Sequence, residues 1–281
     1  MNSVTTKCNA KINLSIDVLK RRPDGYHDVE LILNEISLRD TLTVTLNKTG
    51  VIHLSCSDKT LPSDSKNIAY RAAELFFSET GSDFGAEIDL VKKIPHGAGL
   101  AGGSADAAGV LRALNKLTGS PLSADKLAAL ALNLGADVPF CLNGGCALAE
   151  GIGEILTPLP HLKNLIYVIV KPKESISTAY VYNNLDLSNR PKNLNIRAVA
   201  DGIINGDTAA IARNSGNILE SVTAKKYPVI SEIKQALYDS GAILSMMSGS
   251  GTAVFGMFDE FIQAHVAAES MRKFSDEIYL V

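Results

Sequence analysis

The sequence has no tryptophan, few cysteines and no strong excess of either charge. Its formal net charge is −3 over 281 residues. A domain that grips nucleic acid by its phosphates usually carries a clear surplus of Lys and Arg, so we expect no nucleic-acid partner. No run approaches the roughly 20 apolar residues that a membrane-spanning helix needs, and we expect no membrane partner. An anionic ligand must therefore be bound by local donors.

The four cysteines are too few and too irregularly spaced to indicate a metal site or a disulfide framework. They are Cys8, Cys56, Cys141 and Cys146, and no two of them form a CxxC motif. The spacing of the last two fits no common zinc motif. The first residues also lack the apolar run and cleavage site of a signal peptide. We therefore predict reduced thiols in a cytoplasmic protein. Separately, we expect either a monomer or a homodimer.

Alternating polar and apolar residues predict strands in the first half of the chain. Ala10, Ile12, Leu14 and Ile16 recur with period 2. Asn67 is placed to cap a helix whose apolar residues share one face. Further strands are predicted at residues 31–38, 41–46, 51–56 and 86–94, and a further helix at 123–134. The first half of the chain is therefore predicted to contain mainly strands, together with helices.

A domain boundary is predicted at Pro158 and Pro160, dividing the chain into residues 1–160 and 161–281. The second part mixes both element types. Strands are predicted at residues 165–170, 242–247 and 253–258 and at the end of the chain, and helices at 177–182, 217–222, 228–240 and 260–273. The pattern indicates an α+β fold.

The glycine-rich segment, residues 95–106, has the sequence PHGAGLAGGSAD and lies between a predicted strand and a predicted helix. Glycine has no Cβ, so backbone N–H groups can converge on an anion. A helix starting near Ser104 would add its free N–H groups and the positive end of its dipole. One or two glycines would suffice for a packed turn, whereas four occur here. The segment therefore predicts a phosphate-binding site.

Three other interpretations of glycine motifs in this region fail. Gly97-Ala-Gly-Leu-Ala-Gly102 matches GxGxxG, but a dinucleotide site needs a second strand ending in Asp or Glu about 20 residues later. That window holds Thr118-Gly-Ser-Pro121. No Lys follows a glycine in the register of a Walker A loop. Asp83-Phe-Gly85 precedes the glycine-rich segment, whereas the protein-kinase order places it far after.

Several polar residues are candidates for the chemistry, each with a simpler alternative. Asp137, after a predicted helix end, is either a catalytic base or a turn cap. Lys11 lies on the polar face of the first strand and is either functional or solvated. Tyr26 and His27 either stack on a base or pack together on the surface. The turn at residues 248–252 either binds phosphate or simply closes a β-hairpin.

Taken together, these segments resemble the GHMP kinases over nearly the whole chain. The resemblance is carried by residues 10–14, 21–27, 95–104, 135–140 and 247–255, read as AKINL, RRPDGYH, PHGAGLAGGS, GADVPF and MSGSGTAVF. It implies a two-domain α+β fold with an N-terminal domain like ribosomal protein S5 domain 2 and a ferredoxin-like C-terminal domain. It also implies ATP-dependent phosphorylation of the 2-hydroxyl of a cytidyl diphosphate substrate, in the non-mevalonate route to isoprenoid precursors.

The resemblance also implies which residues form the site. Asp137 would act as the base, with Lys11 keeping its carboxylate ionised. The phosphates of ATP would be lined by Pro95, His96, Gly97, Ala98, Gly99, Leu100, Ala101, Gly102, Gly103, Ser104 and Ala105. The cytidyl substrate would contact Asn13, His27, Thr178 and Tyr26, with the Tyr26 ring stacked on cytosine.

Two questions stay open on the sequence alone. Ala105 stands where many family members have a second Ser, which leaves Ser104 as the single hydroxyl there. Mg²⁺ is expected as the counter-ion of ATP, and no protein ligand is assigned to it. The alternatives are another GHMP activity, such as a sugar or homoserine kinase, and a protein of another class, either a nucleotide-binding protein without catalysis or an NAD-dependent enzyme.

Overall fold

The computed structural model describes residues 2–188, 190–191 and 193–281, and they form two compact units. Unit 1 comprises the stretch that ends at Lys11, together with Ile36–His96 and Ala101–Gly144. Unit 2 comprises Ile12–Glu35, Gly97–Leu100 and the described part of Gly145–Val281. The long strands β1 (Ser3–Arg21) and β2 (His27–Asn47) therefore contribute to both units. The boundary at residue 160 stays a prediction.

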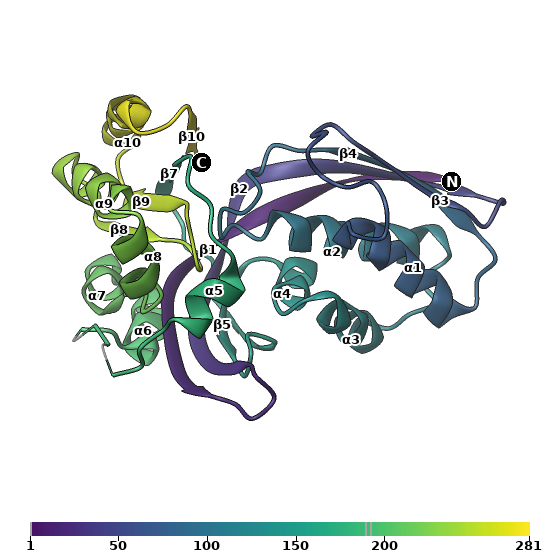
Figure 1. Ribbon diagram of the computed structural model, residues 1–281, viewed down its shortest axis with the longest axis horizontal. Helices are drawn as coiled ribbons and strands as arrows, with labels where there is room; N and C mark the ends of the chain where they lie inside the picture. The colour runs from purple at the N-terminus through teal and green to yellow at the C-terminus, as the bar shows by residue number, and fades with distance from the viewer. Residues whose placement is uncertain (1, 189, 192) are drawn as a thin grey trace. The chain divides into compact units, whose positions relative to one another are not determined.

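Unit 1 packs helices on strands. The second half of β2 pairs antiparallel with β4, and β3 runs parallel to β4, with α1 as the crossover between β3 and β4. Helices α1 to α4 lie along one side of these strands (Figure 1). The elements are β3 (Ile52–Cys56), β4 (Gly85–Val91), α1 (Ile68–Thr80), α2 (Gly102–Leu117), α3 (Ala124–Leu134) and α4 (Val138–Asn143).

The core of unit 1 explains why its helices form where they do. The Asn67 side chain accepts a hydrogen bond from the Ala69 N–H at 3.0 Å, which confirms the predicted N-cap of α1. Phe76 of α1 is fully buried, as are Val110 and Leu111 of α2. Burying these apolar faces between helices and strands is the main driving force for the layer.

Unit 2 contains a four-stranded antiparallel sheet in the order β10-β7-β9-β8. Numbered along the chain, these strands stand in the order 4-1-3-2, with helices after the first and third. That is the ferredoxin-like arrangement predicted above. The bounds are β7 (Ile166–Lys171), β8 (Leu244–Met247), β9 (Val254–Phe258), β10 (Glu277–Leu280), α9 (Val229–Asp239) and α10 (Phe261–Ser270), followed by a 3₁₀ turn (Met271–Lys273).

The remaining elements of unit 2 pair with the N-terminal strands or connect the sheet. The first half of β2 pairs with β5, which in turn pairs with β6. The elements are β5 (Cys146–Glu150), β6 (Ile155–Leu159), α5 (Thr178–Asn183), α6 (Ile196–Asn205), α7 (Thr208–Asn214) and α8 (Glu220–Lys226). Among the described residues, no helix combines the length and apolar character that crossing a membrane requires.

Several predictions about elements were wrong. The strands predicted at residues 31–38 and 41–46 are one strand, β2, because Asp40 is buried and bonded to backbone N–H groups instead of ending the strand. Strands β5 and β6 and helices α4, α6 and α7 were not predicted. Pro158, one of the two residues at which the boundary is predicted, lies within β6 opposite Ala147.

Candidate active site

Lys11 and Asp137, far apart in the sequence, form an ion pair in unit 1. Lys11 Nζ lies 3.7 Å from Asp137 Oδ2. The Lys11 side chain is only 4% exposed, whereas that of Asp137 is 42% exposed. A buried ammonium thus faces a carboxylate that an incoming ligand can reach. The two residues meet as predicted, and their catalytic roles stay predictions.

The local structure removes the simpler explanation offered for each partner. Lys11 is buried on β1, as are Asn13 and Ser15, so the face predicted to be polar is not solvated. Asp137 follows the end of α3 at Leu134, as predicted, and it also occupies the N-cap position of α4, a helix that was not predicted. Its side chain makes no capping hydrogen bond there. A buried Lys is rarely found without a partner, and Asp137 is a partner of this one.

The glycine-rich segment adopts a left-handed backbone at several positions. Gly97 and Gly99 have φ angles of +62° and +76°. Ala101 has φ +57° at the N-cap position of α2, where no side chain caps the helix. The helix begins at Gly102, two residues before Ser104, near which its start was predicted, so two further N–H groups belong to its first turn. An uncapped N-terminus of a long helix is suited to bind an anion.

The turn at residues 248–252 contacts the glycine-rich segment within unit 2. It joins the antiparallel strands β8 and β9, so the β-hairpin interpretation is confirmed. Ser248 Oγ donates to the Gly99 carbonyl at 3.0 Å and accepts from the Asn13 N–H at 3.2 Å. A Cβ on Gly99 would lie 2.0 Å from the Ser248 carbonyl oxygen, so only glycine fits. Ser248 thereby links the glycine-rich segment, predicted to bind ATP, to Asn13, predicted to contact the cytidyl substrate.

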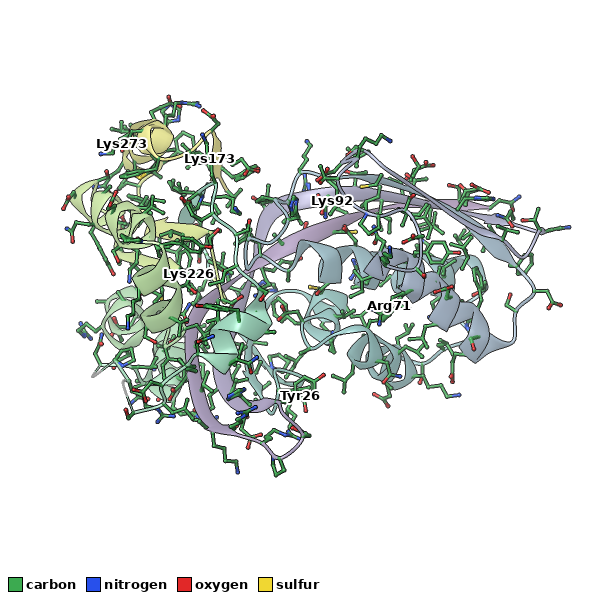
Figure 2. All side chains as sticks on the ribbon, viewed as in Figure 1. Tyr26, Arg71, Lys92, Lys173, Lys226 and Lys273 are labelled. Carbon is green, nitrogen blue, oxygen red and sulfur yellow. The ribbon has the colours of Figure 1, made fainter. Side chains whose placement is uncertain are left out.

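Tyr26 lies in the turn between β1 and β2 in unit 2 (Figure 2). Its side chain is 60% exposed, so it is available to a ligand. Asp24 Oδ1 accepts a hydrogen bond from the Tyr26 N–H at 3.1 Å and fixes the turn. Tyr26 does not pack on His27 in the predicted pair, because no ring contact between them is present among the described residues.

His27 instead contacts Tyr182, an aromatic residue that the sequence did not single out. Their ring centroids lie 5.1 Å apart with planes at 41°. Burial, and then the charge of Arg21, lower the pKa of His27. Thr178, at the first position of α5, lies with its Oγ1 2.9 Å from Ser250 Oγ. Thus Tyr182 and Thr178 both come from α5, and Tyr182 adds an aromatic face.

Comparison with known proteins identifies the family. Residues 67–145 match the description "GHMP kinases N terminal domain" and residues 199–277 match "GHMP kinases C terminal". Over 281 residues the chain is 45% identical to a 4-diphosphocytidyl-2-C-methyl-D-erythritol kinase of Alkaliphilus metalliredigens, covering 100% of this chain and 97% of that protein. The chain belongs to the GHMP kinase family.

Further relatives place this GHMP kinase more closely. A kinase of the same name from Clostridium botulinum strain Loch Maree is 42% identical over 275 residues, or 98% of either chain. The crystal structure of a 4-(cytidine 5'-diphospho)-2C-methyl-D-erythritol kinase superposes with a TM-score of 0.84 at 35% identity, covering 99% of this chain and 98% of that one. A homoserine kinase from Cytophaga hutchinsonii, at 23% identity and TM-score 0.79, shares the fold, covering 100% of this chain and 94% of that chain.

This GHMP kinase also holds a buried ion cluster that sequence reasoning missed. Lys92, which follows β4, bonds to the carboxylates of Asp40 and Asp106. Burial, opposed by the charge of Lys92 and reinforced by that of Asp40, raises the pKa of Asp106 to about 7. The position of Asp106 at the end of the glycine-rich segment could have indicated this cluster. Lys92 gave no such indication, because a Lys that follows a strand is usually solvated.

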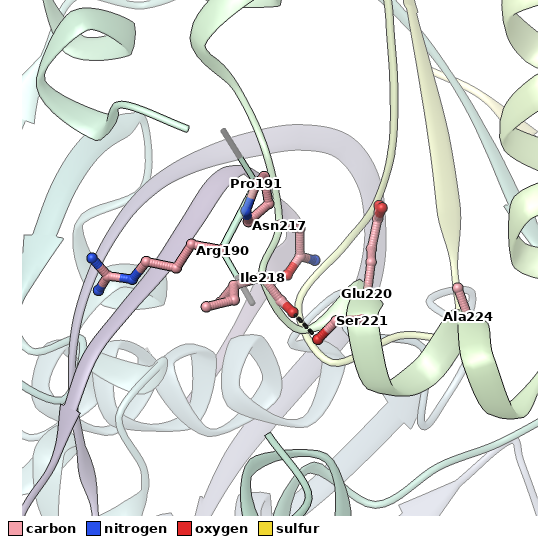
Figure 3. A pocket seen from close by; sticks show the side chains of 7 residues that line it. All are labelled: Arg190, Pro191, Asn217, Ile218, Glu220, Ser221 and Ala224. Atoms are coloured by element: carbon pink, nitrogen blue, oxygen red, sulfur yellow. Dashed lines mark hydrogen bonds between the residues drawn. The ribbon is translucent and has the colours of Figure 1, made fainter. Parts of the chain in front are cut away.

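A pocket in unit 2 of this GHMP kinase lies apart from the predicted site residues, none of which lines it (Figure 3). Its volume is about 330 Å³, and its lining includes Glu220 and Asn217. Both side chains are committed to structure. Asn217 Nδ2 donates to the Met247 and Gly249 carbonyls at 2.8 Å, and Glu220 Oε1 accepts from the Met247 N–H at 2.7 Å. We assign this pocket no ligand.

Proposed function

We propose that this protein transfers the γ-phosphoryl group of ATP to the 2-hydroxyl of 4-diphosphocytidyl-2-C-methyl-D-erythritol, in the non-mevalonate route to isoprenoid precursors. The observation that carries the proposal is the buried Lys11 facing the accessible Asp137. It occurs in a chain that is 45% identical, along its full length, to a kinase named for this substrate.

In this proposal Asp137 is the base and Lys11 holds it. The substrate hydroxyl oxygen attacks the γ-phosphorus, the bond from that phosphorus to the bridging oxygen of ADP breaks, and the hydroxyl proton passes to the Asp137 carboxylate. Phosphoryl transfer asks a protein chiefly for positioning and charge stabilisation. Lys11 contributes to positioning, because its buried ammonium group lies 3.7 Å from Asp137 Oδ2 and restricts the orientation of that carboxylate.

The glycine-rich segment would bind the phosphates of ATP. Gly97, Gly99 and Ala101 have left-handed backbone, which would direct neighbouring N–H groups toward a phosphate. The uncapped N-terminus of α2 would add further free N–H groups. Ser104 lies in the first turn of that helix and is the single hydroxyl there, because Ala105 follows it. Backbone donors of this kind bind an anion without a neighbouring cation.

Mg²⁺ is expected as the counter-ion of the ATP phosphates. Within the described part of the chain, no group of three or more His, Cys, Asp and Glu side chains is arranged to hold a metal ion. Mg²⁺ often binds through substrate phosphates with few protein carboxylates. We assign it no protein ligand, and no step above depends on it.

The cytidyl group would bind beside Tyr26, His27 and Tyr182. Tyr26 offers an exposed ring, and the tilted pair of His27 and Tyr182 offers a second aromatic surface. Stacking on an aromatic ring suits a pyrimidine base. Asn13 and Thr178 complete the proposed contacts. The cytoplasmic location and the choice between monomer and homodimer stay predictions.

The experiment that tests the function is a coupled assay of ADP release from ATP. We expect turnover with 4-diphosphocytidyl-2-C-methyl-D-erythritol and only background release with homoserine, with mevalonate or with no acceptor. Mass spectrometry of the product should show one added phosphoryl group. Faster turnover with homoserine or a sugar would contradict the proposal and assign a different activity within the family.

A nucleotide-binding protein of another class is tested by thermal shift. A ligand that binds only the folded state raises the Tm. We expect ATP to raise the Tm and NAD to leave it unchanged. A larger shift with NAD would contradict the proposal, because the glycine-rich segment would then bind a dinucleotide.

Replacing Tyr26 by Ala should weaken binding of the cytidyl substrate alone. Aromatic stacking on a base is worth about 1–3 kcal/mol, so we expect KM for this substrate to rise by roughly 5- to 150-fold, with kcat nearly unchanged. The exposed ring makes little packing, so the fold should be unaffected. Tyr26→Phe, which keeps the ring, is the matched control and should resemble wild type. An unchanged KM in Tyr26→Ala would remove Tyr26 from the base site.

A further inference from the structure

A buried ion cluster lies in unit 1, at the base of the glycine-rich segment. Its members are Asp40 on β2, Lys92 after β4 and Asp106 on α2, and Figure 2 labels Lys92. Lys92 Nζ lies 2.7 Å from Asp106 Oδ2 and also bonds to Asp40. Asp40 is fully buried and Asp106 is 2% exposed. Buried ion pairs are weak evidence for stability, because desolvation offsets their attraction, so a positional role must be considered.

Lys92 links the two ends of the glycine-rich segment, because its ammonium group bonds to both Asp40 and Asp106. Asp40 Oδ1 accepts from the N–H groups of Lys93 and Ile94, with 2.9 Å to Ile94, and so holds the backbone that enters the segment. Asp106, in the second turn of α2, holds the helix that leaves it. The intervening residues form a loop closed at its base by Lys92.

The first residue of α2 packs directly on this cluster. A Cβ placed on Gly102 would lie 2.9 Å from Ile94 Cγ2 and 3.3 Å from Lys92 Nζ. Gly102 therefore brings the N-terminal backbone of α2 closer to the cluster than any other residue allows. The direction of the first N–H groups of this helix thus depends on where Lys92 and Ile94 lie.

The carboxylate of Asp106 is not fully used by the fold. Asp106 Oδ1 is buried and has no hydrogen-bond partner among the described residues. Most buried polar atoms are paired, so an acid kept only for stability would be expected to have both oxygens bonded.

We propose that Asp106, acting through Lys92 and Asp40, is a positioning residue for the phosphates of ATP. This rests on the proposed function, in which the glycine-rich segment binds those phosphates. Asp106 itself touches no phosphate. It fixes the start of α2 against the end of β4, and the N–H groups that would bind the phosphates follow from that placement.

The test compares Asp106→Ala and Asp106→Asn with Asn115→Ala in the full-length protein. Asn115 is the matched control, because it lies in the same helix and its buried side chain bonds to Leu122 N and O at 3.0 and 3.1 Å. We expect Asp106→Ala to raise KM for ATP by about tenfold, with KM for the cytidyl substrate changed by less than about twofold. Asp106→Asn should give an intermediate KM for ATP, because its amide oxygen still accepts from Lys92. Asn115→Ala should lower the Tm and leave KM for ATP unchanged.

A merely structural cluster predicts a different result. An Asp106→Ala variant with a lowered Tm and an unchanged KM for ATP would overturn the proposal. If that variant does not fold, Asp106→Asn decides alone, and its KM for ATP must exceed that of wild type by about threefold, because an amide binds an ammonium less strongly than a carboxylate does.

Calorimetric titration with ADP, without any acceptor, separates this proposal from the proposed function. If wild type fails to phosphorylate the cytidyl substrate but binds ADP, the function is wrong and the Kd values of the three variants still test Asp106. Weaker ADP binding in Asp106→Ala than in Asn115→Ala supports the positioning role, and equal binding contradicts it.

Discussion

Replacing Asp137 by Asn should lower kcat by about 10²- to 10⁴-fold, the range that a positioned general base contributes. The amide keeps the shape of the side chain but cannot accept the hydroxyl proton as a carboxylate does. Because the glycine-rich segment is untouched, KM for ATP should change by less than about threefold. A loss in kcat without a loss in binding is the pattern of an interaction made only in the transition state. Steady-state kinetics with both substrates varied would measure it.

Asp125→Asn provides the matched control for this prediction. Asp125 also lies in unit 1, in the first turn of α3, and is exposed. The same chemical change there removes one negative charge without touching Lys11, so activity should stay within about twofold of wild type. Near-normal turnover in Asp137→Asn would exclude Asp137 as the base and leave the Lys11 pair as a structural feature.

Replacing Gly99 by Ala should have the second largest effect, this time on both stability and ATP binding. The new Cβ would lie 2.0 Å from the Ser248 carbonyl oxygen, and Gly99 has φ +76°, which L residues adopt at a cost. Backbone shifts forced by overpacking cost about 1–3 kcal/mol, and the left-handed conformation about 1 kcal/mol more. We expect the free energy of unfolding to fall by about 2–4 kcal/mol and KM for ATP to rise strongly. Urea unfolding and kinetics would measure the two effects.

Gly97→Ala separates backbone strain from collision. Gly97 has φ +62°, but its nearest neighbour to a new Cβ is Ser175 Oγ at 3.9 Å, an ordinary contact. Gly97→Ala should therefore show the strain of about 1 kcal/mol without the collision. Equal destabilisation by both substitutions would mean that the contact between Gly99 and Ser248 has no energetic importance.

The local turns around the candidate site could be predicted because they restrict residue type locally. Four glycines between a strand and a helix predicted a turn followed by a helix start with free N–H groups, and α2 starts there without a side-chain cap. The hairpin at residues 248–252 likewise follows from two apolar strands flanking a glycine turn. In each case the signal lies within about ten residues, where sequence patterns are informative.

The contacts that the residues alone could not predict join distant parts of the chain. No spacing relates Lys11 to Asp137, and their meeting was expected only from the family resemblance. Lys92 was missed because a Lys after a strand usually faces water, whereas here two carboxylates brought together by the fold bury it. Tyr182 was missed because one aromatic residue on a short helix forms no pattern.

The error at β2 has a similar cause. Two strands were predicted, at residues 31–38 and 41–46, and Arg39 and Asp40 fall between them. Asp40 is instead fully buried, with its carboxylate bonded to the N–H of Ile94 at 2.9 Å. Asp40 thus makes a tertiary contact from within one continuous strand, and only its distant partners reveal that role.

The division of the chain into interleaved units has a consequence for how the protein is made. All residues of unit 1 precede Cys146, but unit 2 needs partners from both ends of the chain. Ile16 on β1 forms a bridge with Asn217, and the Ser15 hydroxyl donates to the Gly216 carbonyl at 3.1 Å. A ribosome therefore releases everything that unit 1 requires by residue 144, while the middle of β1 must wait for residues 216 and 217. Pairings so distant in sequence form slowly, so these contacts of β1 are expected to form late in folding.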